Sequence, residues 1–318
     1  MATLRELVTG KGFDASQGII EEVSKTVPEL DFFDAMFTPG TSFQSVAQTS
    51  DPTTGFRAVG AGIAASDEGY RLDTFNLGIL AGLVQRDKAA FDADVRGREA
   101  ALNAAAVSLI RSAMKSLAAK VWYGAKTGNE KFNGASAIVK AALTVDAGGE
   151  AATGSGVPSG LSSVYAIGKG LDRCHLVFCE SSPLLNAAEL TWKEGTMTVE
   201  SKPVPTYWTD LSCWAGFACR NQNALARLAN LNGTKHLSDE LLAELVAKFA
   251  EANDGQNPDA IFCTFAQRLA LQKSRGVNVS TGKGSSIVVS APVPLEYAGI
   301  PIIATNSLTA TETAYSAS

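Results

Sequence analysis

The sequence is poor in the residues on which catalysis and metal binding most often depend. It has two histidines, His175 and His236, and five cysteines among 318 residues. An odd number of cysteines in a long chain favours reduced thiols, and folding in a cytosolic compartment, over a disulfide scaffold. Neither histidine has a nucleophile signature beside it, so we expect both to be structural residues whose hydrogen bonds are satisfied.

Long apolar segments are lacking as well. No apolar run reaches the roughly 18 residues of a membrane-spanning helix, and residues 1–16 contain no apolar core of a signal peptide, so we expect neither a membrane span nor secretion. The chain has 27 Lys and Arg against 32 Asp and Glu, a net charge of −5, which argues against a broad basic face for nucleic acid. Its 46% of hydrophobic residues predict a globular protein with a sizeable core.

No motif predicts a reactive site. Cys174 and Cys179 would face opposite sides of one strand, so they could not share a metal, and Cys213 and Cys219 do not have the spacing of a zinc knuckle. The stretch 276–284 is similar to a Walker loop but has one residue too many and a glycine where Ser or Thr should bind magnesium. We therefore predict no catalytic residue, metal site or cofactor, and a structural or assembly protein rather than an enzyme.

The N-terminal 86 residues look unable to fold alone. In the arm 1–40, Asp14 can cap a helix that Pro28 ends, and the aromatic residues that follow need a partner surface on the body of this chain or on a neighbour. Residues 41–86 are rich in Thr, Ser, Gln and Gly, with strands predicted at 43–48 and 71–83. They predict a long, weakly apolar hairpin, which would be marginal in isolation.

The clearest expected element is one helix over residues 87–123. Asp87 can cap it, apolar residues from Phe91 to Val121 recur at steps of three and four, and Pro is absent. Gly124 stands where a left-handed C-cap belongs. At about 1.5 Å per residue the helix would be roughly 50 Å long. Its apolar stripe drifts through Ala-rich turns, which favours a helix lying on a sheet over a coiled coil.

The remaining sequence alternates short strands and helices. Strands are predicted at 163–167, 175–179, 207–219, 260–263, 286–290 and 300–304, and helices at 225–231, 237–252 and 265–274. Ser238 can cap the helix at 237–252, whose leucines line one face. The fold class that this pattern indicates is α+β.

Five stretches, taken in chain order, carry a family resemblance. They are 57–63 (RAVGAGI), 122–134 (WYG, then EKFNG), 162–170 (SSVYAIGKG), 214–230 (WAGFACR, then ARLAN) and 297–302 (YAGIPI). Together they resemble the hairpin, helix exit, first body strand, strand-to-helix segment and closing turn of tailed-bacteriophage major capsid proteins with the Hong Kong 97 type of shell fold. The stretch 178–183 (FCESSP) departs from the Lys-bearing Gly loop that the family usually has there.

The resemblance implies a Hong Kong 97-like capsid fold. Its parts would be an N-terminal arm (1–40), an extended β-hairpin or E-loop (41–86), a peripheral domain (87–234) with a long spine helix (87–123), and an axial domain with the closing strands (235–318). The boundaries are approximate.

The implied function is that of a major capsid protein, which self-assembles into an icosahedral shell around viral double-stranded DNA. The chain would be found in the virion, after assembly in the host bacterial cytoplasm. Its partners would be copies of itself in hexamers and pentamers, with portal, scaffolding and decoration proteins as further candidates, DNA only as enclosed cargo, and no membrane. The resemblance transfers no catalytic residue, and we predict no covalent cross-link between subunits.

Two other functions fit part of the sequence. An encapsulin-like shell of a cellular compartment would share the fold, and a secreted adhesin-like β protein is a candidate of a different class, opposed by the missing signal peptide and the long helix. For the capsid function we expect contacts between subunits through residues of the arm and the hairpin. They are Phe32, Phe33, Phe37, Phe43, Phe56, Arg57, Ile63, Tyr70 and Arg71.

Overall fold

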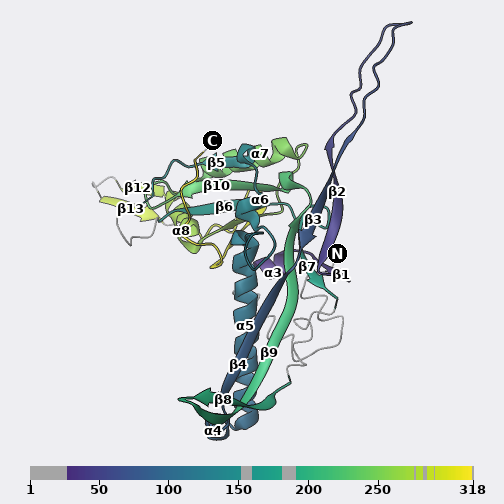
Figure 1. The fold of residues 1–318 in the computed structure, drawn as a ribbon. Coiled ribbons are helices and arrows are strands. Elements are labelled where there is room, and N and C mark those ends of the chain that lie inside the picture. Colours follow the sequence, from purple (N-terminus) through teal and green to yellow (C-terminus); the bar gives the residue numbers. More distant parts are fainter. Residues whose placement is uncertain are drawn as a thin grey trace.

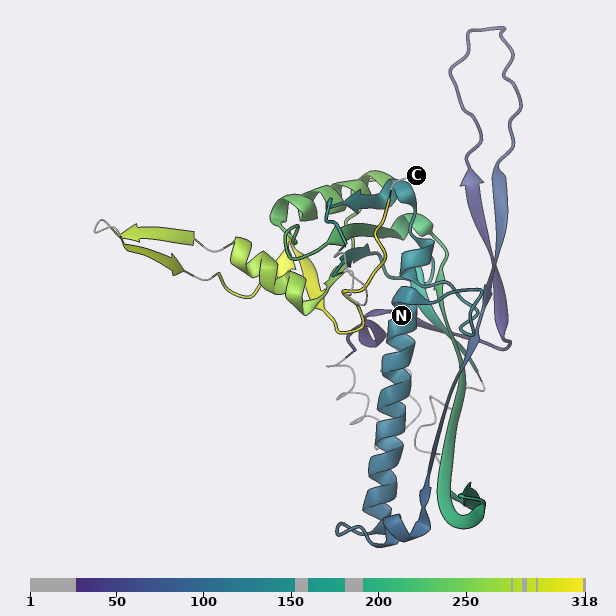
Figure 2. The same ribbon diagram turned by 60° about the vertical axis from the view of Figure 1, so that its left-hand side comes forward.

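The protein consists of a body of two sheets from which three extensions project (Figure 1, Figure 2). The computed structural model describes residues 27–151, 160–180, 191–275, 277–281, 285–289 and 291–316. The helix expected after Asp14 lies outside these residues. Pro28, expected to end that helix, precedes the short helix α3 (Glu29–Phe32) as its N-cap. No helix in the described ranges is long and apolar enough to cross a bilayer.

The first sheet has five strands and forms the long axis of the molecule. Its path is β1 (Ala35–Thr38), β7 (Cys174–Cys179), β9 (Lys202–Cys219) and β4 (Gly78–Asp87), with β8 (Lys193–Val199) also paired to β9. The β1–β7 pair is parallel, and the pairs that β9 makes with β7, β4 and β8 are antiparallel. Helix α5 (Arg98–Tyr123) runs alongside β4 and β9 (Figure 1).

The second sheet has six strands. Their order is β14 (Glu296–Tyr297), β15 (Ile300–Ala304), β11 (Ala260–Cys263), β6 (Ser162–Ile167), β10 (Leu225–Leu231) and β5 (Thr144–Asp146). Alternation along β6 sends Val164 toward the leucines of α7 (Asp239–Ala252) and Tyr165 toward Trp122 of α5. The sheet is therefore buried on both faces, which explains why its strands are apolar almost throughout.

Smaller elements complete the described part of the chain. They are β2 (Ser42–Ser50), β3 (Gly69–Asn76), α4 (Lys88–Asp92), α6 (Ala135–Ile138), α8 (Phe265–Ser274), the hairpin of β12 (Val277–Thr281) and β13 (Ser285–Val289), and the 3-10 turns η1 (Ala141–Leu143) and η3 (Gln222–Ala224). The β12–β13 hairpin projects to one side of the body (Figure 2). The predicted bounds of β11, α8 and β15 are confirmed, and Ser238 caps α7 through the amide of Leu241.

The helix predicted over 87–123 is interrupted. Asp87 caps α4 as expected, by accepting a hydrogen bond from the amide of Ala89 at 2.9 Å. The helix then breaks, because the Asp94 side chain caps the amide of Arg96 and Gly97 adopts φ +91°, which is not helical. Val95, expected on the apolar stripe, is fully exposed.

Gly124 does not form the left-handed C-cap that was predicted. Its backbone is extended, with φ −60° and ψ 147°. The glycine is needed for a different reason, since a Cβ at this position would lie 2.6 Å from the Lys120 carbonyl oxygen and 3.1 Å from Phe132. The chain passes so close to the end of α5 that only hydrogen fits there.

Two further predictions about elements are wrong. Residues 225–231 are the strand β10 rather than a helix, because a short apolar run buried on both sides looks the same in either state. The strand expected at 71–83 is two strands, β3 and β4, that meet at Leu77. The Leu77 amide still follows the β2–β3 register, because it donates to the Thr41 carbonyl at 2.8 Å, and from Gly78 onward the chain pairs with β9 in the first sheet.

Candidate assembly site: the projecting hairpin

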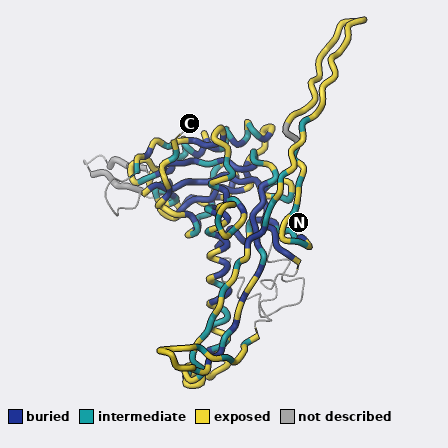
Figure 3. The backbone as a smooth tube through the Cα atoms, in the orientation of Figure 1, coloured by how far each residue is buried: buried dark blue, intermediate teal, exposed yellow. Residues whose placement is uncertain are grey.

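The hairpin of β2 and β3 extends well beyond the body, and its tip carries exposed apolar side chains. The strands pair from Ser42↔Asn76 to Ser50↔Gly69, and residues 51–68 continue past them without helix or strand (Figure 2). Phe56 and Val59 at the tip are fully exposed, and Ile63 is 62% exposed. Figure 3 shows the whole tip as exposed backbone with nothing of this chain beside it.

Local polar contacts hold the tip together. The Thr53 amide donates to the hydroxyl of Ser66 at 2.8 Å, and the Arg57 guanidinium donates to the carbonyl of Ala61, also at 2.8 Å. Such contacts are too few to offset the backbone entropy of ordering the segment, which costs about 1–2 kcal/mol per residue. The apolar residues at the tip therefore require a surface from outside this chain to become buried.

The strands of the hairpin are also exposed. Val46 and Leu72 are directly opposite each other and are 63% and 58% exposed, and Tyr70 is 59% exposed. Arg71 forms an ion pair with Asp73 at 2.7 Å on the same strand. An ion pair this exposed contributes about 0–1 kcal/mol, so this pair adds little to the stability of the hairpin.

The base of the hairpin, by contrast, packs firmly on the first sheet. Phe43 stacks on Phe75, with ring centroids 5.0 Å apart, and the Arg220 guanidinium lies 5.5 Å from the centroid of Phe43. Both phenylalanines pack against a small buried cluster that includes Val177 and Ala218. The hairpin is thus anchored at one end and free at the other.

His175 lies beneath this base and differs from the satisfied histidine that was expected. Its side chain is buried, its ring lies 6.1 Å from that of Phe43, and neither ring nitrogen has a hydrogen-bond partner within the described ranges. Burial, reinforced by the positive charge of Arg220, lowers the pKa of His175 to about 4. The ring is therefore neutral at physiological pH. His236 is exposed.

The aromatic residues of the arm belong to this chain's own core. Phe33 is completely buried, with its ring 5.3 Å from that of Phe217, so the expectation that it contacts a neighbouring subunit is wrong. The cause is α3, which turns Phe33 inward against both sheets. Phe32 lies 5.1 Å from Phe262 and is half-buried, and Phe37 lies in β1, paired with β7.

Sequence reasoning missed a second exposed apolar surface. Ile79 and Leu83 on β4 are 55% and 60% exposed, while the alternate residues Leu80 and Val84 face α5. Gly82 on the α5 side lets the helix approach, since a Cβ there would lie 2.6 Å from Leu109. The two-residue alternation was present in the sequence, but nothing in it showed which face the helix would cover.

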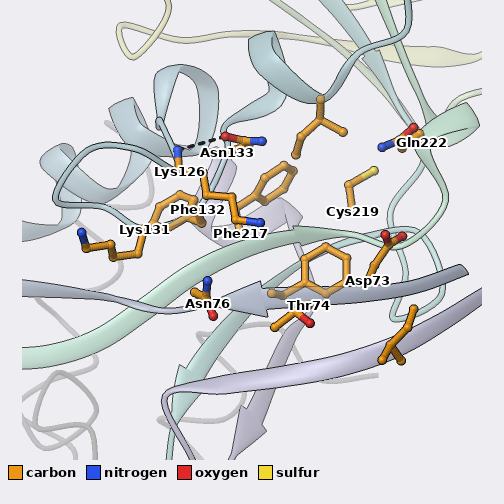
Figure 4. A pocket seen from close by; sticks show the side chains of 13 residues that line it. Asp73, Thr74, Asn76, Lys126, Lys131, Phe132, Asn133, Phe217, Cys219 and Gln222 are labelled. Carbon is orange, nitrogen blue, oxygen red and sulfur yellow. Dashed lines mark hydrogen bonds between the residues drawn. The ribbon is translucent and has the colours of Figure 1, made fainter.

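The described residues contain no arrangement suited to metal binding. No group of three or more His, Cys, Asp or Glu side chains is placed to hold an ion, within the described ranges. All five cysteines are buried, and none is joined in a disulfide. A cavity of about 320 Å³ lies where the hairpin base meets the loop after α5, lined by polar side chains such as Lys126, Lys131 and Asn133 (Figure 4).

Comparison with known proteins gives a match along almost the whole chain. The family model for major capsid protein GP7 matches residues 14–316. Among solved structures, bacteriophage epsilon15 is similar with a TM-score of 0.55 at 14% identity, covering 86% of this chain and 85% of that chain. The bacteriophage JBD30 capsid gives a TM-score of 0.49 at 10% identity over 86% of this chain and 88% of that one.

An encapsulin complex also shows similarity. The SrpI encapsulin of Synechococcus elongatus gives a TM-score of 0.43 at 11% identity, over 65% of this chain and 89% of that chain. No curated protein sequence matches this chain.

Proposed function

The chain belongs to the family of major capsid protein GP7, and we propose that its hairpin β2–β3 with the tip 51–68 is the arm by which one subunit of the shell holds the next. The expected tailed-phage capsid family and the Hong Kong 97-type fold are confirmed. The protein has the structural, shell-forming role of that family.

The exposed tip is the observation that carries the proposed arm. Phe56, Val59 and Ile63 are large apolar residues, and complete burial of each would contribute about 1.5–3 kcal/mol. Their own chain buries none of them. In a shell every subunit has neighbours at fixed positions, so each copy can bury the tip of another, and the gain repeats around a closed assembly.

The outer face of β4 offers apolar surface that such a contact needs. Ile79 and Leu83 are exposed there, on a strand that is rigidly backed by α5 and β9. Contact between a flexible tip on one subunit and a rigid sheet on another orders only one partner, which keeps the entropic cost of assembly low. Three other hairpin residues were expected to contact a neighbouring subunit. They are Arg57, Tyr70 and Arg71, and they lie at the margins of this contact.

Further parts of the proposal concern the particle. Subunits assemble into hexamers and pentamers in the host bacterial cytoplasm, with portal, scaffolding and decoration proteins as further partners. The shell encloses double-stranded DNA that it does not bind tightly, in keeping with a net charge of −5. The division into arm (1–40), hairpin (41–86), peripheral domain (87–234) and axial domain (235–318) also stands as part of this proposal.

Replacing residues 51–68 by a short Gly-Ser linker tests the arm. We expect the variant to keep its helical circular dichroism and a cooperative melt, because both sheets and α5 lie outside the exchange. Negative-stain images should show no closed shells. A triple change of Phe56, Val59 and Ile63 to Ser should act in the same way, whereas changing Thr53 and Thr54 to Ser should leave assembly intact. Normal shells from the linker variant, or its complete unfolding, would each refute the proposal.

A further inference from the structure

Two of the five cysteines lie directly opposite each other on neighbouring strands. Cys174 begins β7, Cys219 ends β9, and the two are partners in the antiparallel register. Their sulfur atoms are 2.8 Å apart, and both side chains are buried. We propose that Cys174 and Cys219 are a cross-linking site, which a peroxide converts to an intrasubunit disulfide.

The backbone is already in place for this bond. Directly opposite residues of an antiparallel pair have Cα atoms about 4.5 or 5.5 Å apart, within the range of about 4.4–6.8 Å seen in disulfides. The sulfurs need to approach by less than about 1 Å to reach a bond of about 2.05 Å. Small side-chain rotations supply that movement, so neither strand has to shift.

Each of the other three cysteines stands opposite a residue other than cysteine in the sheet register. Cys179 is opposite Thr38 in the β1–β7 pair, Cys213 is opposite Leu80, and Cys263 is opposite Ala304. In the described sheets, Cys174 and Cys219 are thus the one cysteine pair in direct register. The register itself selects which thiols can react.

The cavity at the hairpin base gives a small oxidant a route to one of the two sulfurs. Cys219 is among its lining residues (Figure 4), whereas Cys174 does not line it. The remaining walls include Asp73, Asn76 and Gln222, whose polar side chains suit a hydrophilic molecule such as hydrogen peroxide. Cys219 is therefore the residue that meets the oxidant first.

Oxidation of the two thiols by the peroxide then takes two steps. The Cys219 sulfur attacks one peroxide oxygen, the O–O bond breaks, and the products are a sulfenic acid at Cys219 and one water. The Cys174 sulfur attacks the Cys219 sulfur, the S–S bond forms, the S–O bond breaks, and a second water leaves. The two thiols lose two electrons and two protons in total, and the peroxide is reduced to water.

The bond would brace the protein at the foot of the hairpin. It closes a loop from residue 174 to residue 219 that contains β8 and nearly all of β9. Closing a loop of this length restricts the unfolded chain, and we expect the melting temperature to rise by about 5–10 °C. Cys219 is followed by Arg220, whose guanidinium lies over Phe43 at the hairpin base. This inference does not depend on the proposed arm.

Treatment of the purified full-length protein with hydrogen peroxide tests the proposal. Titration of thiols after denaturation should fall from five to three, and peptide mapping should link Cys174 to Cys219. Cys263→Ser is the matched control, since it removes a buried cysteine without a partner and should still lose two thiols. Cys174→Ser should stop at a sulfenic acid on Cys219, trapped by dimedone, and Cys219→Ser should retain all its thiols.

Three outcomes would each overturn the proposal. They are five thiols remaining after peroxide treatment, a link between any other pair of cysteines, or a link between two subunits. A Cys174–Cys219 link that leaves the melting temperature unchanged would refute the bracing role.

Discussion

Arg227 and Glu312 form a buried ion pair between the middle of the second sheet and the C-terminal segment. The Arg227 guanidinium lies 2.7 Å from the Glu312 carboxylate, with only 12% and 6% of the two side chains exposed. The same carboxylate accepts hydrogen bonds from the hydroxyls of Tyr123, at 2.6 Å, and Ser163. Burial and the charge of Glu312 raise the pKa of Tyr123 well above its usual value. One side chain thus ties together the C-terminal segment, α5, β6 and β10.

Glu312→Ala should be among the most destabilising changes outside the apolar core. It leaves the Arg227 guanidinium buried without a counter-charge, and breaking a buried pair costs about 3–5 kcal/mol. Urea unfolding followed by circular dichroism measures the loss, with the exposed Glu296→Ala as control. If Glu312→Ala lowered the free energy of unfolding as little as Glu296→Ala does, water would have replaced the carboxylate as the partner of Arg227.

Stability should fall in mild acid because of His175. The folded state holds the pKa of His175 at about 4, against 6.5 in the unfolded chain, so between these values the unfolded chain binds a proton that the folded chain does not. The free energy of unfolding is therefore highest above pH 6.5 and falls by roughly 3 kcal/mol as the pH drops to 4. Unfolding free energies measured across this range should decline less steeply in His175→Leu than in His236→Ala. Equal slopes would contradict the prediction.

Leu117→Asp should prevent folding, whereas Ser116→Asp should not. Leu117 is 3% exposed on the face of α5 that packs against the sheets, and its neighbour Ser116 faces solvent. A carboxylate buried without a partner costs several kcal/mol. Soluble yield and the cooperativity of thermal melting compare the two variants, which have the same charge one position apart. A cooperative melt from Leu117→Asp would show that α5 can rotate to expose this position.

Gly78→Ala should destabilise the junction of β3 and β4. A Cβ there would lie 2.2 Å from the carbonyl oxygen of Glu130, which is backbone and cannot rotate away. Overpacking of this kind costs about 1–3 kcal/mol. Gly62→Ala is the control, because nothing lies within 4 Å of a Cβ at that position. Melting temperatures of the two variants should differ by several degrees, and equal values would mean that the loop at Glu130 moves freely.

The sequence allowed good prediction of elements that depend on local pattern. The helix over 98–123, the caps at Asp87 and Ser238 and the bounds of α8 follow from apolar spacing and side-chain chemistry within a few residues. The hairpin was expected for a similar reason, since a stretch with few apolar residues cannot join a core. Its proposed role between subunits came from the family resemblance, because sequence composition alone could not identify a partner.

The other features of the fold could not be predicted from the sequence, because they depend on contacts between distant parts of the chain. Whether 225–231 becomes a strand is decided by β6 and β5, which pair with it from far along the sequence. Phe33 is buried because Phe217 and Phe262 lie over it, and neither is near it in sequence. The contact of Cys174 with Cys219 follows from the register of β7 and β9, which spacing along one strand could not reveal.

Because of the long ladder between β4 and β9, the resistance of the subunit to a pulling force depends on the direction of that force. It runs without interruption from Gly78↔Ala215 to Asp87↔Thr206, beside α5. Its hydrogen bonds are perpendicular to the strands, so a pull along the ribbon loads all of them together, whereas a pull across it opens them one at a time. A wall made of such subunits is stiff along the ribbons and gives way by peeling at their ends. Its strength under internal pressure therefore depends on how the ribbons are oriented around the particle.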